Sequence, residues 1–161
     1  GIATFLGTPS SANLLAAVSD ETGTGALVFA NTPTLVTPVI GAATGTSLAL
    51  SGSLTLADAL IGTATQTLTG DTATVVDSWS ATTYRSAKYI VQMVKGDDIE
   101  VLEVLVTVNG TNNVYITEYA DVVSNAVIGT TDADYSGGNV RLKVTASNDT
   151  VVKVHKTLIE A

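Results

Sequence analysis

The run IEVLEVLVTV, from Ile99 to Val108, is the most apolar stretch of this 161-residue chain. From Leu102 onward every second side chain is apolar, and Glu103 and Thr107 stand between them. A period of two places alternate side chains on opposite faces of a β-strand. The run therefore predicts a central strand whose apolar face meets a core.

Turn signals and alternating segments flank this run on both sides. Asn109-Gly110 is typical of a type I′ turn, whose two central positions need positive φ, so Val114 to Ala120 is predicted to pair back across a hairpin. Gly96-Asp97-Asp98 predicts another turn. The strand predicted before it runs from Ala87 to Val94, with alternate residues on its two faces.

The same spacing continues through the rest of the C-terminal half. The other predicted features are an opening at Val75-Val76 and Trp79, strands at Val122 to Thr130, Val140 to Val144 and Val151 to Ile159, a glycine-rich loop from Asp132 to Asn139, and a tight turn at Asn148-Asp149. Six strands at roughly ten-residue spacing predict a compact antiparallel β-sandwich over residues 75–161, with a barrel as the alternative.

The charge of the chain argues against several kinds of partner. The chain has 15 acidic and 7 basic residues, and no base precedes Arg85. Nucleic acids and anionic membranes bind clustered Lys and Arg, so we expect neither as a partner. The chain has no cysteine, which excludes disulfides and thiolate chemistry, and it has no run of about 18 apolar residues that would predict a membrane helix.

Residues 1–74 have a different composition, dominated by Thr, Ala, Gly, Leu, Ser and Val. Their aliphatic residues come in short, scattered groups. This is too apolar for an ordinary disordered tail and too dispersed for one compact core. We therefore expect an extended, fibre-like segment that buries its apolar side chains against identical chains in a multi-chain assembly.

One short helix is predicted near the start of this segment. Thr8 is the expected N-cap and Pro9 suits the first helical position. Leu14, Leu15 and Val18 share one face at helical spacing. A helix of about ten residues is marginal alone, so this face is expected to need a partner surface.

Extended chain is predicted after the helix. Ala26 to Phe29 is expected to form a short buried strand, and the prolines at 33 and 38 favour extended geometry from Asn31 to Ile40. A weak repeat follows, in which Ser47-Leu48-Ala49-Leu50 recurs as Ser53-Leu54-Thr55-Leu56. It predicts turns of a β-helical shaft with the four leucines inward, or alternatively a plain hairpin with its turn near Gly52.

The string GIATFLGTPSSANLLAAVSDETGTGALVFA, from Gly1 to Ala30, resembles a segment of bacteriophage tail fibres and related virion proteins. The likeness continues in kind through TLVTPVIG, from Thr34 to Gly41, and covers about a quarter of the chain. It implies a virion part in which residues 1–74 form a shaft or connector. Such segments are usually trimeric, so the resemblance also implies an intertwined homotrimer. Residues 75–161 resemble, less specifically, the small β-domains at the ends of phage structural proteins.

Candidate chemistry is sparse. His155 is the single histidine and has no nucleophile nearby in the sequence pattern. Two acidic clusters, at Asp97, Asp98 and Glu100 and at Asp132 and Asp134, offer oxygen ligands or a carboxylate pair, but neither has the spacing of a calcium loop. We expect solvated turn acids, and therefore no enzyme, no cofactor and no metal site.

The leading hypothesis is a structural virion protein of a tail fibre or similar trimeric appendage, in contact with other virion proteins. Its candidate trimer interface consists of Leu14, Leu15, Val18, Leu48, Leu50, Leu54 and Leu56. The alternative is a receptor-binding module whose β-domain recognises a host-surface glycan or protein. Tyr115 and Tyr119 are the candidates for that surface, because both fall on one face of a predicted strand with Thr117 between them.

Overall fold

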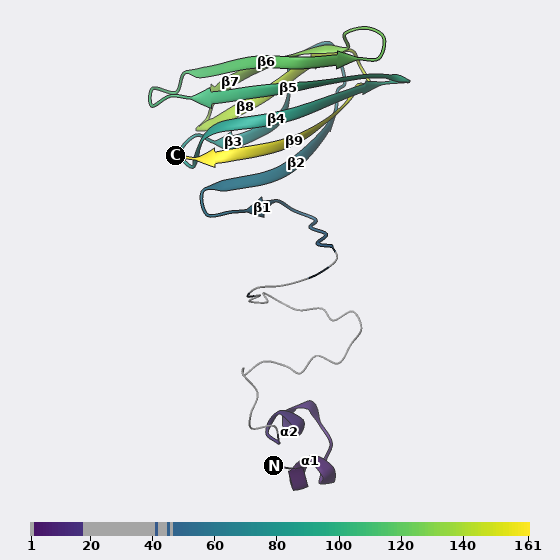
Figure 1. The fold of residues 1–161 in the computed structure, drawn as a ribbon, viewed down its shortest axis with the longest axis vertical. Helices are drawn as coiled ribbons and strands as arrows, with labels where there is room; N and C mark the ends of the chain where they lie inside the picture. Colours follow the sequence, from purple (N-terminus) through teal and green to yellow (C-terminus); the bar gives the residue numbers. More distant parts are fainter. Residues whose placement is uncertain (1, 18–40, 42–44, 46) are drawn as a thin grey trace. The chain divides into compact units, whose positions relative to one another are not determined.

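The computed structural model describes residues 2–17, 41, 45 and 47–161 (Figure 1). The chain divides into two units, residues 1–46 and residues 47–161. The expected strand from Ala26 to Phe29, the extended run from Asn31 to Ile40, and Val18 lie outside the described residues.

Two short helices, α1 (Ile2–Gly7) and α2 (Ser11–Leu15), form the described part of the first unit. Thr8 does not cap α2, because its hydroxyl and its backbone N–H both donate to the carbonyl of Thr4 in α1. Ser10 is the N-cap instead, with extended backbone and a side chain that accepts from the N–H of Asn13 at 3.1 Å. The predicted helix is therefore shorter than expected and begins two residues later.

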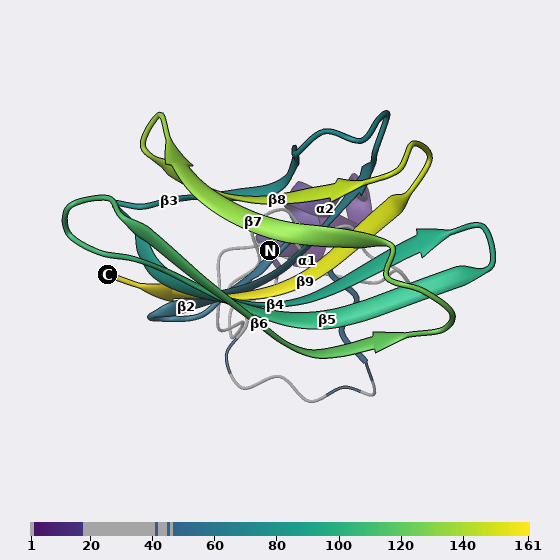
Figure 2. The same cartoon turned by 90° about the horizontal axis from the view of Figure 1, so that it is seen from above.

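The second unit is an antiparallel β-sandwich, so the mainly β prediction is confirmed (Figure 2). A six-stranded sheet, in the order β1-β2-β9-β4-β5-β6, packs against a three-stranded sheet, β3-β8-β7. The strands are β1 (Leu54–Thr55), β2 (Ala59–Thr67), β3 (Thr74–Ser80), β4 (Tyr84–Lys95), β5 (Asp98–Val108), β6 (Val114–Val123), β7 (Gly129–Ser136), β8 (Asn139–Ala146) and β9 (Val151–Glu160).

The core lies between the two sheets and follows the predicted alternation. In β5 the side chains of Leu102, Val104, Val106 and Val108 are buried, as the opening run predicts. β8 supplies the facing layer through Val140, Leu142 and Val144. The sheets approach closely at Gly129, where a Cβ atom would lie 2.8 Å from Met93 Sδ and 2.8 Å from the Thr145 carbonyl. Glycine is required at this position because any side chain would overlap both.

The boundary expected between residues 74 and 75 falls inside the second unit. β2 pairs along its whole length with β9, and Leu68 is fully buried in the core. The three threonines at 63, 65 and 67 point outward, and Ala64 packs on the core. Their uncharged side chains resemble a fibre segment in composition, although the strand belongs to the sandwich.

The leucine repeat also differs from its prediction. Residues 47–53 form no strand within the chain, and β1 pairs with β2 through Leu54↔Ile61 and Thr55↔Leu60. The turn of this hairpin lies after Leu56, whose N–H donates to the Ala59 carbonyl at 2.7 Å. The alternative prediction of a hairpin with its turn near Gly52 is therefore wrong.

The two-residue turn predicted after β5 is found between β7 and β8 instead, and the connection after β5 is a longer loop. The loop after β5 spans Asn109 to Asn113, and its positive-φ residue is Asn112 (64°) rather than Gly110. The Asn109 side chain stabilises the loop by accepting from the N–H groups of Thr111 and Asn113. The tight two-residue turn with positive φ at both positions is instead Gly137 (58°) and Gly138 (88°), between β7 and β8.

β7 occupies the region predicted to be a glycine-rich loop. The prediction of one strand from Val122 to Thr130 is also wrong, because β6 continues to Val123 and β7 starts at Gly129. The acidic residues of β7 pair with basic residues of β8, and this pairing stabilises a polar strand whose composition is typical of a loop. Seven strands, β3 to β9, lie in the region where six were predicted, and β1 and β2 precede it.

Candidate functional site

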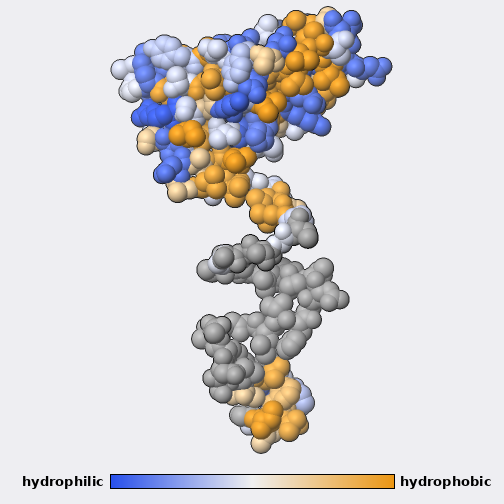
Figure 3. Space-filling model, viewed as in Figure 1, coloured by the Kyte–Doolittle hydropathy of each residue, from blue (hydrophilic) through white to orange (hydrophobic). Residues whose placement is uncertain are grey.

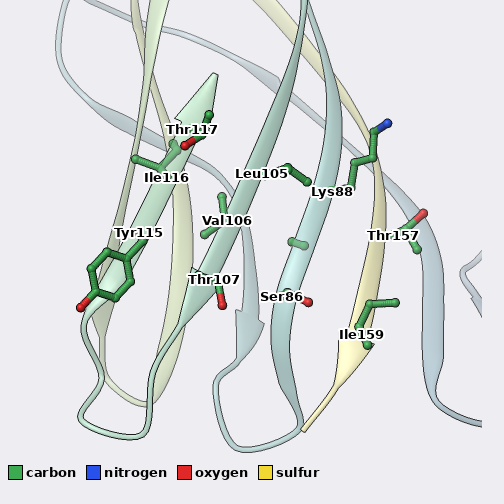
Figure 4. Close-up of a pocket in the computed structure, with 11 residues that line it drawn as sticks. Ser86, Lys88, Leu105, Val106, Thr107, Tyr115, Ile116, Thr117, Thr157 and Ile159 are labelled. Carbon is green, nitrogen blue, oxygen red and sulfur yellow. The ribbon is translucent and has the colours of Figure 1, made fainter. Parts of the chain in front are cut away.

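The outer face of the six-stranded sheet carries a shallow groove of about 550 Å³ (Figure 4). Register places Tyr115, Thr107, Ser86 and Ile159 in one row across β6, β5, β4 and β9. Large side chains stand at the two ends of this row and small hydroxyl side chains lie between them. The groove exists because Ser86 and Thr107 form its low floor.

The neighbouring row closes one side of the groove. It consists of Thr117, Leu105, Lys88 and Thr157 on the same four strands. Its Leu105 is 46% exposed, and the ends of the first row, Tyr115 and Ile159, are 56% and 48% exposed. The groove therefore presents apolar surface with few charges.

Lys88, Glu103 and Tyr119 form the polar border of this groove. Lys88 Nζ lies 2.9 Å from Glu103 Oε2 and 6.0 Å from the centre of the Tyr119 ring. The hydrogen bond from Lys88 lowers the pKa of Glu103, and the Glu103 carboxylate raises the pKa of Tyr119. Tyr115 and Tyr119 lie on one face of β6, but Tyr119 is engaged by charges and Tyr115 borders the apolar groove.

Apolar side chains also lie at the opposite edge of the sheet, where Figure 3 shows a hydrophobic patch that hydrophilic residues separate from the rest of the face. Leu54 of β1 lies opposite Ile61, and Ile61 lies opposite Thr157, so the row of Leu105 extends to β1. We name the set Leu54, Ile61, Leu105, Tyr115 and Ile159 the large-sheet face.

The other predicted interface leucines lie beside this edge. Leu48, Leu50 and Leu56 are 78%, 52% and 48% exposed, and Leu54 is 40% exposed. In the first unit Leu14 is half-buried, and the side chains of Leu15 and Val18 lie outside the described residues. Within the chain, four of the predicted leucines therefore project into solvent.

The outer face of the three-stranded sheet is covered by ion pairs instead. Arg141 donates from Nε and Nη2 to the two oxygens of Asp134 at 2.6 and 2.7 Å. Lys143 Nζ lies 2.9 Å from Asp132 and 3.0 Å from Asp134. The hydrogen bond from Arg141 lowers the pKa of Asp134 to about 2, and Lys143 lowers the pKa of Asp132. We name these four side chains the small-sheet ladder.

The other residues tested for chemistry are dispersed. Glu100 is 2% exposed, and its carboxylate accepts from the N–H groups of Ile128 and Gly129 at the start of β7. His155 lies on the outer side of β9, opposite Thr63 and Ile90. Among the described residues no group of three His, Cys, Asp or Glu side chains is placed to hold a metal ion. The described helices are all too short or too polar to cross a membrane.

A buried polar network between the sheets was missed by the sequence reasoning. Trp79 Nε1 donates to the Tyr89 hydroxyl at 2.9 Å, and that hydroxyl donates to Asp77 Oδ2 at 2.8 Å. Lys156 Nζ lies 2.6 Å from Asp77 Oδ1. A signal was present in the sequence, because Asp77 stands between the apolar residues Val76 and Trp79.

No protein-family profile matches the chain, and no curated protein matches it. Among solved structures, the tailspike protein of Acinetobacter phage vB_ApiP_P1 is similar over 75% of this chain, with 13% identity and a TM-score of 0.42. The tailspike protein of Acinetobacter baumannii phage AM24 is similar over 63% of this chain, with 12% identity and a TM-score of 0.35. The chain covers 26% and 25% of these two tailspikes, about a quarter of each.

Proposed function

We propose that the chain is a structural component of a phage tail fibre or similar virion appendage and works as a homotrimer. The observation that supports the proposal is the large-sheet face, which presents Leu105, Tyr115 and Ile159 to solvent beside the exposed leucines of residues 48–56. The small-sheet ladder, by contrast, is already satisfied within one chain.

Burial of apolar surface would drive the assembly of identical chains. Each square ångström of apolar surface removed from water contributes about 25 cal/mol, and a standard-size interface buries about 1,600 Å² in total. A small domain has only about 5–15 kcal/mol of net stability by itself. Burial of the large-sheet face against identical copies would therefore add stability comparable to that of the fold.

Residues 1–46 are proposed to form the shaft or connector of this appendage. The support is their resemblance to fibre segments, together with the clustered leucines at 14 and 15 and Val18. Each of these is proposed to face the same side chain in neighbouring copies. The mechanism is mechanical: chains pair along the shaft, and the sandwich packs round the threefold axis.

A second candidate function is recognition of a host-surface glycan or protein. The groove beside Tyr115 favours it, because an exposed aromatic ring with the threonines at 107 and 117 as neighbours is a suitable platform for a sugar ring. The two functions use the same surface, so both cannot hold for the same groove in one assembled particle.

Light scattering coupled to size exclusion tests the leading proposal. The expected result is a mass three times that of one chain, at micromolar concentration and physiological salt. A folded monomer at that concentration would overturn the homotrimer. A monomer that binds glycans on an array would favour the recognition function over the structural one.

A further inference from the structure

The ion pair between Asp77 and Lys156 differs from the other ion pairs of the described residues. Its side chains are 6% and 12% exposed, whereas every other pair has at least one side chain that is 33% exposed or more. Lys156 Nζ is held 2.6 Å from Asp77 Oδ1. An amine and a carboxyl group are therefore held in contact at a site with little access to water.

The position of Lys156 is made possible by a glycine. Lys156 lies opposite Gly62 across the β2–β9 pair, and a Cβ atom on Gly62 would lie 3.3 Å from Lys156 Cε. The lysine side chain therefore has room to lie against the inner face of the sheet and reach β3 of the other sheet. Asp77 comes from a bulge in β3, where the register shifts between Val75 and Asp77.

Tyr89 places a hydrogen-bond donor on the second oxygen of the same carboxyl group. Its hydroxyl lies 2.8 Å from Asp77 Oδ2, and Trp79 Nε1 fixes the hydroxyl from the other side at 2.9 Å. Burial raises the pKa of Tyr89, so the phenol keeps its proton. A fixed donor at this position stabilises the negative charge that develops on a carbonyl oxygen when a nucleophile adds.

We propose that Lys156 and Asp77 form an intramolecular amide bond that joins the two sheets covalently. A proton passes from the Lys156 ammonium to Asp77 Oδ1, which gives an amine and a carboxylic acid. The Nζ lone pair adds to the Asp77 carboxyl carbon, and the negative charge on Oδ2 is stabilised by Tyr89. The bond from that carbon to Oδ1 breaks, and Oδ1 leaves as water with the second proton from Nζ. The ammonium and carboxylate thus become one amide and one water, with no other reactant.

Two features of the site favour this reaction. Fixed contact between the reacting groups replaces an encounter in solution, and effective molarities for well-oriented groups reach about 10⁵–10⁸ M. The burial of both side chains limits the water that would reverse the step. The product would link β3 to β9 across 79 positions of a chain that has no cysteine for disulfides.

The intact mass of the purified full chain tests the proposal. The expected mass is lower than that of the sequence by one water molecule, with a cross-linked peptide that contains both Asp77 and Lys156 after proteolysis. The exposed pairs Lys88–Glu103 and Lys143–Asp132 are internal controls and are expected to give no linked peptide. A folded chain that retains the full sequence mass after prolonged incubation overturns the amide, whatever any variant does.

Variants locate the reaction at this site. Lys156→Arg is expected to show the full sequence mass, because guanidinium does not form the amide. Asp77→Asn is expected to lose one ammonia instead of one water. Tyr89→Phe is expected to slow the mass change after refolding by about 10²–10³-fold, the effect of losing one such donor. A mass change that persists in Lys156→Arg, or equal rates for Tyr89→Phe and the unaltered chain, would contradict the assignment of these roles.

Discussion

The two outer faces of the sandwich differ in how their side chains are satisfied. On the three-stranded sheet, Asp132 and Asp134 meet Lys143 and Arg141 within the same chain, and every charge has its partner beside it. On the six-stranded sheet, large apolar side chains such as Leu105 stand in solvent around an apolar groove. The charged groups of the three-stranded sheet are therefore satisfied within one chain. The apolar side chains of the six-stranded sheet would be stabilised if another surface removed them from water.

The strongest test of this contrast places a charge on the large-sheet face. Leu105→Lys is expected to convert the proposed trimer into monomers, because a buried charge without a partner costs about 3–5 kcal/mol. Sedimentation velocity at several concentrations measures the change. Ser78→Lys, on the exposed side of β3, is the matched control and should leave the trimer intact. A trimer that tolerates Leu105→Lys would place the interface elsewhere.

A smaller effect is expected from the leucine segment beside that face. Leu48 is 78% exposed, and full burial of a leucine in an interface contributes about 1.5–3 kcal/mol. Leu48→Ser should therefore raise the dissociation constant of the trimer by about tenfold or more, with the unfolding midpoint of the isolated sandwich unchanged. Leu48→Met conserves the apolar volume and should behave like the unaltered chain. Equal assembly of the serine variant would remove Leu48 from the interface.

Tyr115→Ala separates assembly from recognition. If the groove lies in the proposed trimer interface, loss of the ring should weaken assembly by at least about 0.5–1.5 kcal/mol, which is what a packed aromatic pair adds beyond its buried area. Tyr115→Phe, which keeps the ring, should restore most of it. Sedimentation and glycan-array binding are measured on the same samples. A variant that stays fully trimeric but loses a glycan signal would favour the receptor-binding function.

The smallest effect belongs to the small-sheet ladder. Its Asp134 has a pKa lowered from 3.8 to about 2 by Arg141, so the ion pair adds stability above pH 4 and loses it as the pH falls through 2. Because both side chains are about one-third exposed, the loss should be below about 1 kcal/mol. Urea unfolding at a series of pH values measures it. Asp134→Asn should flatten the fall in this range, and an unchanged slope would show that other carboxylates cause it.

The strands with clear alternation were predictable from the sequence. The sequence places β4, β5, β8 and β9 within a few residues because their buried faces are mostly apolar, as Val140, Leu142 and Val144 show in β8. β2 and β7 were not recognised as strands. In both, several outward side chains are threonine or aspartate, and the inward face includes a small residue, Ala64 in β2 and Ala133 in β7. Composition there indicates a loop or a fibre, and only the pairing with β9 or β8 reveals a strand.

The candidate site was predicted in part. The position of Tyr115 and Tyr119 on one face of β6 follows from their spacing, and it is confirmed by the register with β5. The groove could not be predicted, because it depends on Ser86 and Ile159, which come from strands far apart in the sequence. The contact between Asp77 and Lys156 likewise joins residues on different sheets, and no local pattern encodes such a distance.

The place of β9 in the sheet bears on how the sandwich is made. β9 lies between β2 and β4 and hydrogen-bonds to both, so residues 59–67 have no route into the large sheet until residues 151–160 have been synthesised. A chain whose synthesis stops before Val151 lacks β9, so β2 and β4 each keep an edge without a hydrogen-bonding partner. Such a product lacks the sheet face that spans β1 to β6, and its unpaired edges are free to pair with strands of other chains.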